Sequence, residues 1–249
     1  MSIKAFFISL IVYQNILQEK KFITDEYFSE ENNFSVLVLT ETQGFVHHDA
    51  IDEGVKLIRR LGAENKFNVT HTNSSEYLTE EILKKNDVLI FLCTTLDVLN
   101  YEEEEIMKEF IRSGKGFVGI HSATDTEYDW DWYGKLVGAY FLNHPEIQKA
   151  TITTLNNEHI STSHLNKTWE IEDEWYNFKD FKPYINELLN LDETTYEGGE
   201  NGDYHPITWF HEYDGGRSFY TALGHKRETY QDERFIKLLL GGIIYASGN

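Results

Sequence analysis

The side chains in this sequence that could do chemistry are histidines and carboxylates placed where expected strands end. They are His47, His48, His121, Asp125, His144, Glu174 and His225. Neutral imidazole and carboxylate are common ligands of Zn, Fe and Mn, so this set could hold a divalent metal ion. The same groups could also act as general acid and base without a metal. No His-x-x-x-His or His-Glu-x-x-His spacing is present, so the fold must assemble any such site.

Several other chemistries lack the motif that they require. Gly114, Gly116 and Gly119 have the Gly-x-Gly-x-x-Gly spacing, but they lie before and within an expected strand, whereas a phosphate-binding loop follows a strand and opens a helix. No Walker loop is present, so the sequence argues against nucleotide phosphate binding. A Gly-x-Ser-x-Gly nucleophile elbow is also missing. Asp125 and Glu174 could form a glycosidase pair, depending on their separation. A simpler interpretation of His121 is a structural histidine that ends a strand, and the company of the other histidines weakens it.

The element that must position His121 is the apolar run at residues 117–120. Phe117, Val118 and Ile120 are interrupted only by Gly119, which is typical of a strand buried on both faces of a parallel sheet. In open α/β sheets, ligands bind beyond the carboxyl ends of the strands. His121 and Asp125 follow this strand directly, so we expect them at that edge.

The elements before this strand alternate between the two periodicities. Strands are predicted at 34–40, 67–71 and 88–93, and helices at 52–65, after Thr79, and at 102–112. This order predicts an α/β fold, specifically a flavodoxin-like three-layer sandwich with a mostly parallel central sheet. Further along, we predict a strand at 150–155, a hairpin of 207–213 with 217–223 around Asp214-Gly215-Gly216, and a closing helix at 232–246.

Composition limits the partners of this chain. It has 42 acidic against 22 basic residues and a formal charge of −20, which repels nucleic acid and anionic lipid. A neutral small molecule or a bound cation is compatible with that charge. Aromatic residues make up 14% of the chain, and such rings can stack on sugars. The one cysteine, Cys93, lies in an expected strand and reads as an inert core thiol.

The first 33 residues differ in texture from the rest. An apolar run at 5–13 follows Lys4, which suits a signal-peptide core, but no small-residue cleavage site follows and the run is too short to span a membrane. We therefore expect an N-terminal extension or leader at 1–33 and one domain at 34–249. A cytoplasmic location is favoured, and export through this weak signal is the alternative.

Ordered motifs over residues 34–247 resemble the trehalose-utilisation (ThuA-like) family. The matching stretches are 42–45, 116–126, 132–141, His144-Pro145, 173–178, 192–194, 205–207 and 220–225. The resemblance implies a class I glutamine amidotransferase-like fold. In true amidotransferases the turn after the central strand carries a nucleophilic cysteine, whereas the equivalent turn here carries His121-Ser122 and Cys93 lies on another strand. The resemblance therefore argues against glutaminase activity.

The resemblance also implies a substrate class, namely trehalose and related disaccharides, in settings that suggest oxidised 3-keto sugars. Family members commonly carry one histidine shortly after the Gly-Phe pair, often preceded by Arg. Here Val46 replaces that Arg, and His47 and His48 are adjacent. Aligning from Phe45 favours His47, and aligning from Ile51 favours His48, so either residue could be the family histidine.

Together these observations predict a carbohydrate-processing protein, with a lyase- or hydrolase-type enzyme on keto-glycosides as the leading hypothesis. The expected catalytic residues are His121, Asp125 and Glu174. The expected sugar contacts are Trp132, His144, Trp175 and Tyr176, and the expected ligands of a divalent Zn, Mn or Fe ion are His47, His48, His121 and His225. The alternatives are a non-catalytic sugar-binding or regulatory protein and a module that docks a partner. The sequence leaves the oligomeric state open.

Overall fold

A ten-stranded mixed sheet forms the centre of the protein in the computed structural model, which describes residues 25–27 and 33–248. The strand order is β1-β3-β2-β4-β5-β12-β11-β10-β7-β8, and β6 pairs separately with β9. The strands are β1 (Asp25–Tyr27), β2 (Ser35–Leu39), β3 (Asn68–Thr72), β4 (Val88–Leu92), β5 (Gly116–Ile120), β6 (Tyr140–Asn143), β7 (Gln148–Thr154), β8 (Thr168–Asp173), β9 (Asn177–Lys179), β10 (Asn186–Asp192), β11 (Pro206–Tyr213) and β12 (Gly216–Thr221).

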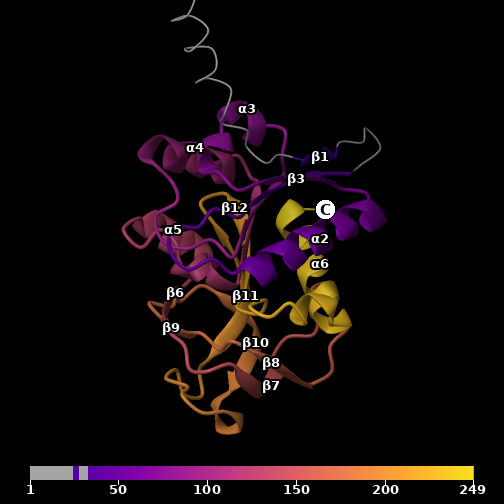
Figure 1. Ribbon diagram of the computed structural model, residues 1–249, viewed down its shortest axis with the longest axis vertical. Coiled ribbons are helices and arrows are strands. Elements are labelled where there is room, and N and C mark those ends of the chain that lie inside the picture. The colour runs from indigo at the N-terminus through magenta and orange to yellow at the C-terminus, as the bar shows by residue number, and fades with distance from the viewer. Residues whose placement is uncertain (1–24, 28–32, 249) are drawn as a thin grey trace, which may run out of the picture.

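Helices cover both faces of the half that contains β3, β2, β4, β5 and β12. They are α2 (His48–Asn65), α3 (Glu80–Leu83), α4 (Tyr101–Arg112), α5 (Asp131–Val137) and α6 (Glu233–Ser247), with short 3-10 turns η1 (Ser75–Tyr77), η2 (His121–Asp125), η3 (Glu193–Thr195) and η4 (Thr229–Gln231). Figure 1 shows α2 and α6 on one side of these strands and α3, α4 and α5 on the other. The predicted α/β fold is confirmed.

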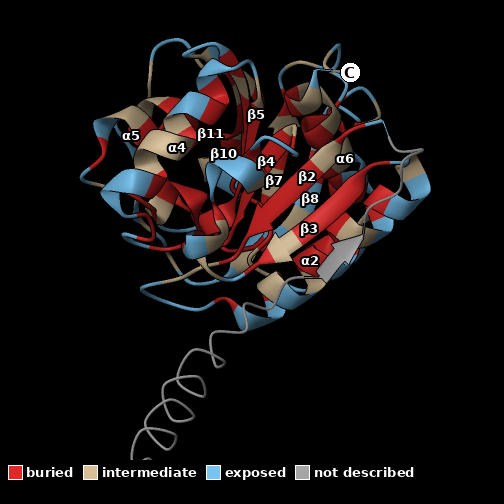
Figure 2. Cartoon of the chain, turned by 90° about the horizontal axis from the view of Figure 1, so that it is seen from above, coloured by how far each residue is buried: buried red, intermediate tan, exposed pale blue. Residues whose placement is uncertain are grey.

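The parallel half owes its burial to continuous apolar strands. All five residues of β4 and all five of β5 are buried, because both faces of these central strands are covered (Figure 2). The β2, β3, β4, β5 and β12 strands pair in parallel, and every other pairing of the large sheet is antiparallel. The sheet is therefore mixed, and its parallel half is the part that the alternating strand and helix patterns predict.

Polar side chains fix where the helices begin. Asn100 accepts hydrogen bonds from the backbone of Glu102 and Glu103 and completes a capping box at the start of α4. Thr79 caps α3 and Asp232 caps α6 in the same way. α2 departs from the prediction, because it begins at His48 rather than near residue 52. This earlier start sets the directions of His47 and His48.

The predicted hairpin places β12, the last strand in the chain, at the centre of the sheet. Asp214 and Gly215 both have positive φ values, 47° and 95°, as a tight two-residue turn between β11 and β12 requires. β12 then pairs in parallel with β5, with Thr221 opposite Ile120. Residues that follow β12 consequently lie beside residues that follow β5.

The end of the antiparallel half also lies beside the residues that follow β12. β11, β10 and β7 separate β12 from β8 in the sheet. Nevertheless Asp173, the last residue of β8, accepts hydrogen bonds from the backbone of Gly224 and His225 in the loop after β12. The two halves therefore close around one edge, where the carboxyl ends of the parallel strands lie.

Two further predictions concern Cys93 and the N-terminal leader. Cys93 is fully buried, as expected of a core thiol, and burial raises its pKa to about 12. The leader expected at residues 1–33 lies largely outside the described residues. Its described part includes β1, which pairs with β3. Among the helices that the structure describes, none combines the length and apolarity that crossing a bilayer demands.

Candidate metal centre

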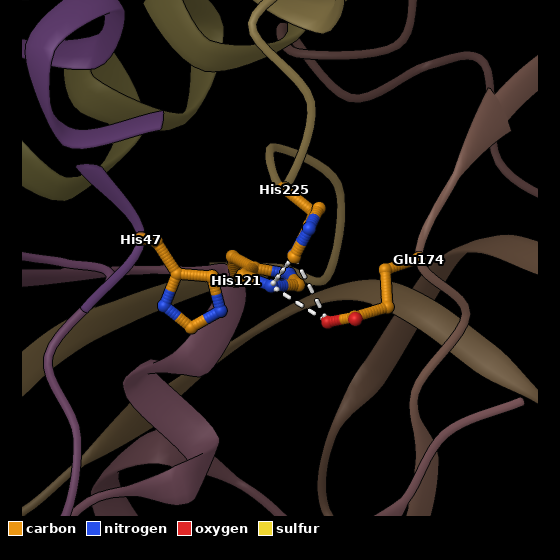
Figure 3. A group of neighbouring side chains, drawn as sticks. All are labelled: His47, His121, Glu174 and His225. Carbon is orange, nitrogen blue, oxygen red and sulfur yellow. Dashed lines mark hydrogen bonds and ion pairs between the residues drawn. The ribbon is translucent and has the colours of Figure 1, made fainter. Parts of the chain in front are cut away.

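Three histidines and one glutamate converge at the carboxyl edge of the parallel strands. His47 precedes α2, His121 follows β5, Glu174 follows β8 and His225 lies after β12. One ligand atom from each lies within 4.8 Å of the others. Figure 3 shows the four side chains directed toward a common centre from four separate segments. Imidazole nitrogen and carboxylate oxygen are suited to Zn, Fe or Mn.

Three of these ligand atoms have the spacing of donors around one cation. Glu174 Oε2 lies 3.3 Å from His121 Nε2 and 3.0 Å from His225 Nδ1. The two histidine nitrogens are 3.2 Å apart. Ligands about 2.1 Å from a shared ion are roughly 3.0 to 3.4 Å from one another in octahedral or tetrahedral geometry. The residues present therefore fit a divalent metal ion.

His121 is held with its Nε2 atom facing the cluster. Its Nδ1 lies 2.9 Å from the carbonyl oxygen of Ala222, which accepts a hydrogen bond from Nδ1–H and so leaves the lone pair on Nε2. Its backbone has a φ of 53°, which is unfavourable for a residue with a side chain. The ring of Tyr176 packs against the His121 ring, with the two ring centroids 4.4 Å apart. A strained, fully buried histidine thus ends the central strand.

His47 and not His48 enters the cluster. The His47 side chain is buried, with its ring 4.7 Å from that of His121 and 5.1 Å from that of His225. Its Nδ1 atom is buried without a hydrogen-bond partner among the described residues. Burial and the neighbouring histidines lower the pKa of His47 to about 2, so the ring is neutral and able to bind a metal. His48 is exposed and lines a separate surface hollow.

Glu174 uses its two carboxylate oxygens differently. Oε2 faces His121 and His225, while Oε1 lies 3.3 Å from His144 Nδ1. Burial would raise the pKa of Glu174, but the interactions with His121 and His225 outweigh burial and hold it below the ordinary value. His144 is at the rim, with 43% of its side chain exposed and Nδ1 also 2.9 Å from the Pro145 carbonyl.

Asp125 lies at the end of η2, the turn that begins with His121, and outside the group of four. Its carboxylate accepts a hydrogen bond from the Tyr128 hydroxyl at 2.6 Å. Burial raises the pKa of Asp125, and the bond from Tyr128 offsets part of that effect. Asp125 is therefore a half-buried carboxyl group close enough to His121 for their charges to interact.

Two of the expected sugar contacts are directed elsewhere. Trp132 donates a hydrogen bond to Asp214 in the hairpin before β12, at the opposite edge of the sheet from His121. Trp175 is fully buried and donates to the carbonyl of Gln148. Its neighbours Glu174 and Tyr176 reach the cluster, because successive side chains of an extended segment point in opposite directions.

One role was missed from the sequence. Glu174 was expected as an acid or base, and the structure makes it a member of the candidate ligand set. No short motif links residue 174 to the histidines. The available signal was only its place after a strand and its acidic type. The curled antiparallel half is what brings this residue to the cluster.

Comparisons with known proteins agree with this fold. The chain is similar to a ThuA-like protein from Bacteroides uniformis (20% identity, 88% of this chain and 94% of that one, TM-score 0.74). It is similar to a ThuA-like protein from Parabacteroides merdae (17% identity, 86% and 90%, TM-score 0.74). It is also similar in fold to part of a β-galactosidase from Bacillus circulans sp. alkalophilus (12% identity, 86% and 31%, TM-score 0.55).

Sequence comparison identifies the family. A search of curated proteins found no match. The family model described as ThuA, trehalose utilisation, matches residues 35–246, which is most of the chain and includes all four residues of the cluster. This protein therefore belongs to the ThuA, or trehalose utilisation, family.

Proposed function

We propose that this protein is a carbohydrate-processing enzyme that binds a divalent Zn, Mn or Fe ion through His47, His121, Glu174 and His225. Its substrate is a disaccharide or keto-sugar of trehalose-type utilisation, and the reaction is of lyase or hydrolase type. The main support is that three imidazoles and one carboxylate converge at the carboxyl ends of the parallel strands, in a chain of the trehalose utilisation family.

Each residue near the cluster has a chemical task in this proposal. A metal ion bound there supplies Lewis-acid polarisation of a sugar oxygen. Asp125 holds or releases a proton, because burial favours its neutral form. His144 keeps its proton on Nδ1, facing the Pro145 carbonyl and Glu174, and offers Nε2 to a substrate hydroxyl at the rim. Tyr176 packs against the His121 ring and helps to hold its orientation.

The fold around this site is also part of the proposal, as a flavodoxin-like parallel half. The order β3-β2-β4-β5-β12, with helices on both faces, supports a flavodoxin-like, three-layer arrangement for the parallel half. In such sheets the strand order reverses next to the first strand, here between β2 and β4, and ligands bind beyond that point. We place residues 34–249 in one domain on the same grounds.

Metal content, affinity and turnover test this function together. The chelated protein would be titrated with Zn²⁺, Mn²⁺ and Fe²⁺ by calorimetry, and keto-glycosides would be assayed with the reloaded protein. We expect one ion per chain in the wild type and a loss of at least tenfold in affinity for His121→Ala and Glu174→Gln. Asp125→Asn is the matched control, because it should keep the metal and lose turnover.

The outcomes separate the alternatives. No binding of any of the three ions would refute the metal centre and favour acid–base chemistry by the same side chains. Metal and sugar binding without turnover of any tested keto-glycoside would favour the non-catalytic sugar-binding protein. Turnover that survives both His121→Ala and Glu174→Gln would exclude the proposed site altogether.

A further inference from the structure

Asp173 is a fully buried carboxylate next to the candidate metal centre, with no place in the chemistry described above. Its two oxygens accept five hydrogen bonds. Oδ1 accepts from the backbone N–H groups of Glu174 (3.0 Å), His225 (3.1 Å) and Lys226 (3.2 Å). Oδ2 accepts from the Gly224 N–H (2.9 Å) and the Thr229 hydroxyl (2.9 Å).

These bonds join two distant parts of the chain. Asp173 ends β8, and four of its five donors lie in residues 224–229, between β12 and α6. Glu174 and His225, two of the four candidate ligands, each donate a backbone N–H to the same carboxylate oxygen. A shared acceptor fixes the distance between the two backbones, and with it the 3.0 Å approach of Glu174 Oε2 to His225 Nδ1.

Other contacts also restrain the 224–229 loop. Lys226 pairs with Glu172 on β8, and Arg227 lies 3.5 Å from Glu53 on α2. The hydroxyl of Tyr230 donates to the carbonyl of Gly224 at 2.8 Å. Exposed ion pairs contribute little to stability, whereas a buried charge with several donors is costly to disturb. Asp173 makes four hydrogen bonds to the loop against one from Tyr230, and is therefore its main restraint.

We infer that Asp173, locked by the Thr229 hydroxyl, is a positioning residue that sets the separation of the candidate ligands Glu174 and His225. This inference rests on the proposed metal site for its effect on affinity, and on contacts within the metal-free protein for its effect on structure. Groups that orient metal ligands commonly change metal affinity by about 10- to 100-fold when they are lost.

The test uses substitutions that change one hydrogen bond. Thr229→Val removes the hydroxyl and keeps the shape, Thr229→Ser restores the hydroxyl, and Asp173→Asn replaces one acceptor oxygen with a donor. Thr162→Val is the matched control. Thr162 is another fully buried threonine, its hydroxyl donates to the Asn156 carbonyl at 2.5 Å, and it lies beyond the opposite end of β8.

Two measurements decide the result in full-length protein. The first is the affinity for Zn²⁺ and Mn²⁺, with the melting temperature of the metal-free protein measured alongside. We expect about tenfold weaker binding for Thr229→Val, a larger loss for Asp173→Asn, and values within about threefold of wild type for Thr229→Ser and Thr162→Val. Equal falls in melting temperature for Thr229→Val and Thr162→Val, with unchanged affinities, would reduce Asp173 to a purely structural role.

The second measurement needs no metal. Hydrogen exchange at the amides of Gly224, His225 and Lys226 should be faster in metal-free Thr229→Val and Asp173→Asn than in the wild type, and unchanged in Thr162→Val. If the wild type binds no metal, the proposed function fails, and this exchange still decides the inference. Unchanged exchange at all three amides in Asp173→Asn would overturn it.

Discussion

Two adjacent histidines show how a single residue's direction decides the site. His47 is the residue before the first turn of α2, with a non-helical backbone (φ −80°, ψ 64°), and its ring turns inward to His121 and His225. His48 is the first helical residue and is exposed. The two residues are chemically identical, so only their backbone positions explain the difference.

Substitution of these two histidines provides an internal control. We expect His47→Ala to weaken metal binding by at least tenfold, because it removes a candidate ligand. His48→Ala should leave the affinity within about twofold of wild type, because His48 lies outside the cluster. Calorimetric titration of both chelated variants checks this. A loss in His48→Ala that matches the loss in His47→Ala would show that our assignment of the two residues is wrong.

The backbone of His121 gives a second test at the residue scale. Its φ of 53° costs a residue with a side chain about 1 kcal/mol relative to glycine. Both His121→Ala and His121→Gly should lose the metal, because both lack the imidazole. His121→Gly should be the more stable of the two by about 1 kcal/mol in urea unfolding of the metal-free proteins. Equal stabilities would show that this turn relaxes without strain.

At the scale of elements, α6 depends on two glycines for its approach to the sheet. A Cβ on Gly241 would lie 2.3 Å from the Cα of Ser161, and one on Gly242 would lie 2.4 Å from the ring of Phe219 in β12. Such distances are far below van der Waals contact. α6 packs on β12, β5 and β4, so it supports the strands that end at the cluster.

Gly241→Ala tests this close packing. At an exposed helix position, Gly→Ala raises the free energy of unfolding by up to about 1 kcal/mol. The sign of the measured change therefore separates helix propensity from steric crowding of the added Cβ. We expect a loss of about 1 to 3 kcal/mol, because the neighbour is backbone and cannot rotate away. Lys237→Ala, at an exposed site of the same helix, should change the unfolding free energy by less than about 0.5 kcal/mol. A stabilised Gly241→Ala protein would contradict the observed approach.

At the scale of the whole molecule, one buried carboxyl group makes stability depend on pH. Glu127 is almost fully buried, and its Oε1 accepts the backbone N–H groups of Val98 and Leu99 at 2.8 Å each. Burial is the largest cause that raises its pKa to about 8, the two backbone bonds oppose it, and Asp97 adds to the rise. The folded state therefore holds a proton that the unfolded chain releases near its ordinary pKa of 4.5.

The sign of the pH effect follows from this difference. Because the folded pKa is raised, the stabilisation is complete below about pH 4.5 and is lost as the pH rises toward 8. We expect Glu127→Gln, which stays neutral, to lose less stability than the wild type between pH 5 and pH 9. Urea unfolding across this range measures it, and the difference between the two proteins cancels the repulsion of the net charge of −20. Parallel curves would mean that Glu127 does not hold this proton.

The sequence by itself determined the parallel half and the edge of the sheet at which the candidate cluster lies. The strands at β2, β4 and β5 and the capped helix α4 followed from apolar periodicity and from Asn100, which are local signals. The positions of His121 and His225 after strands followed from the same patterns. The family resemblance, which depends on ordered motifs along the chain, is confirmed by the family model that matches residues 35–246.

Only the tertiary structure decided which of these side chains meet. The choice of His47 over His48 depends on the residue at which α2 begins, and Trp132 is held at the opposite edge by Asp214. Glu174 joins the histidines because the antiparallel half curls until Asp173 bonds to the loop after β12. That curvature sums small twists over β11, β10, β7 and β8, and no local pattern of residues encodes the sum.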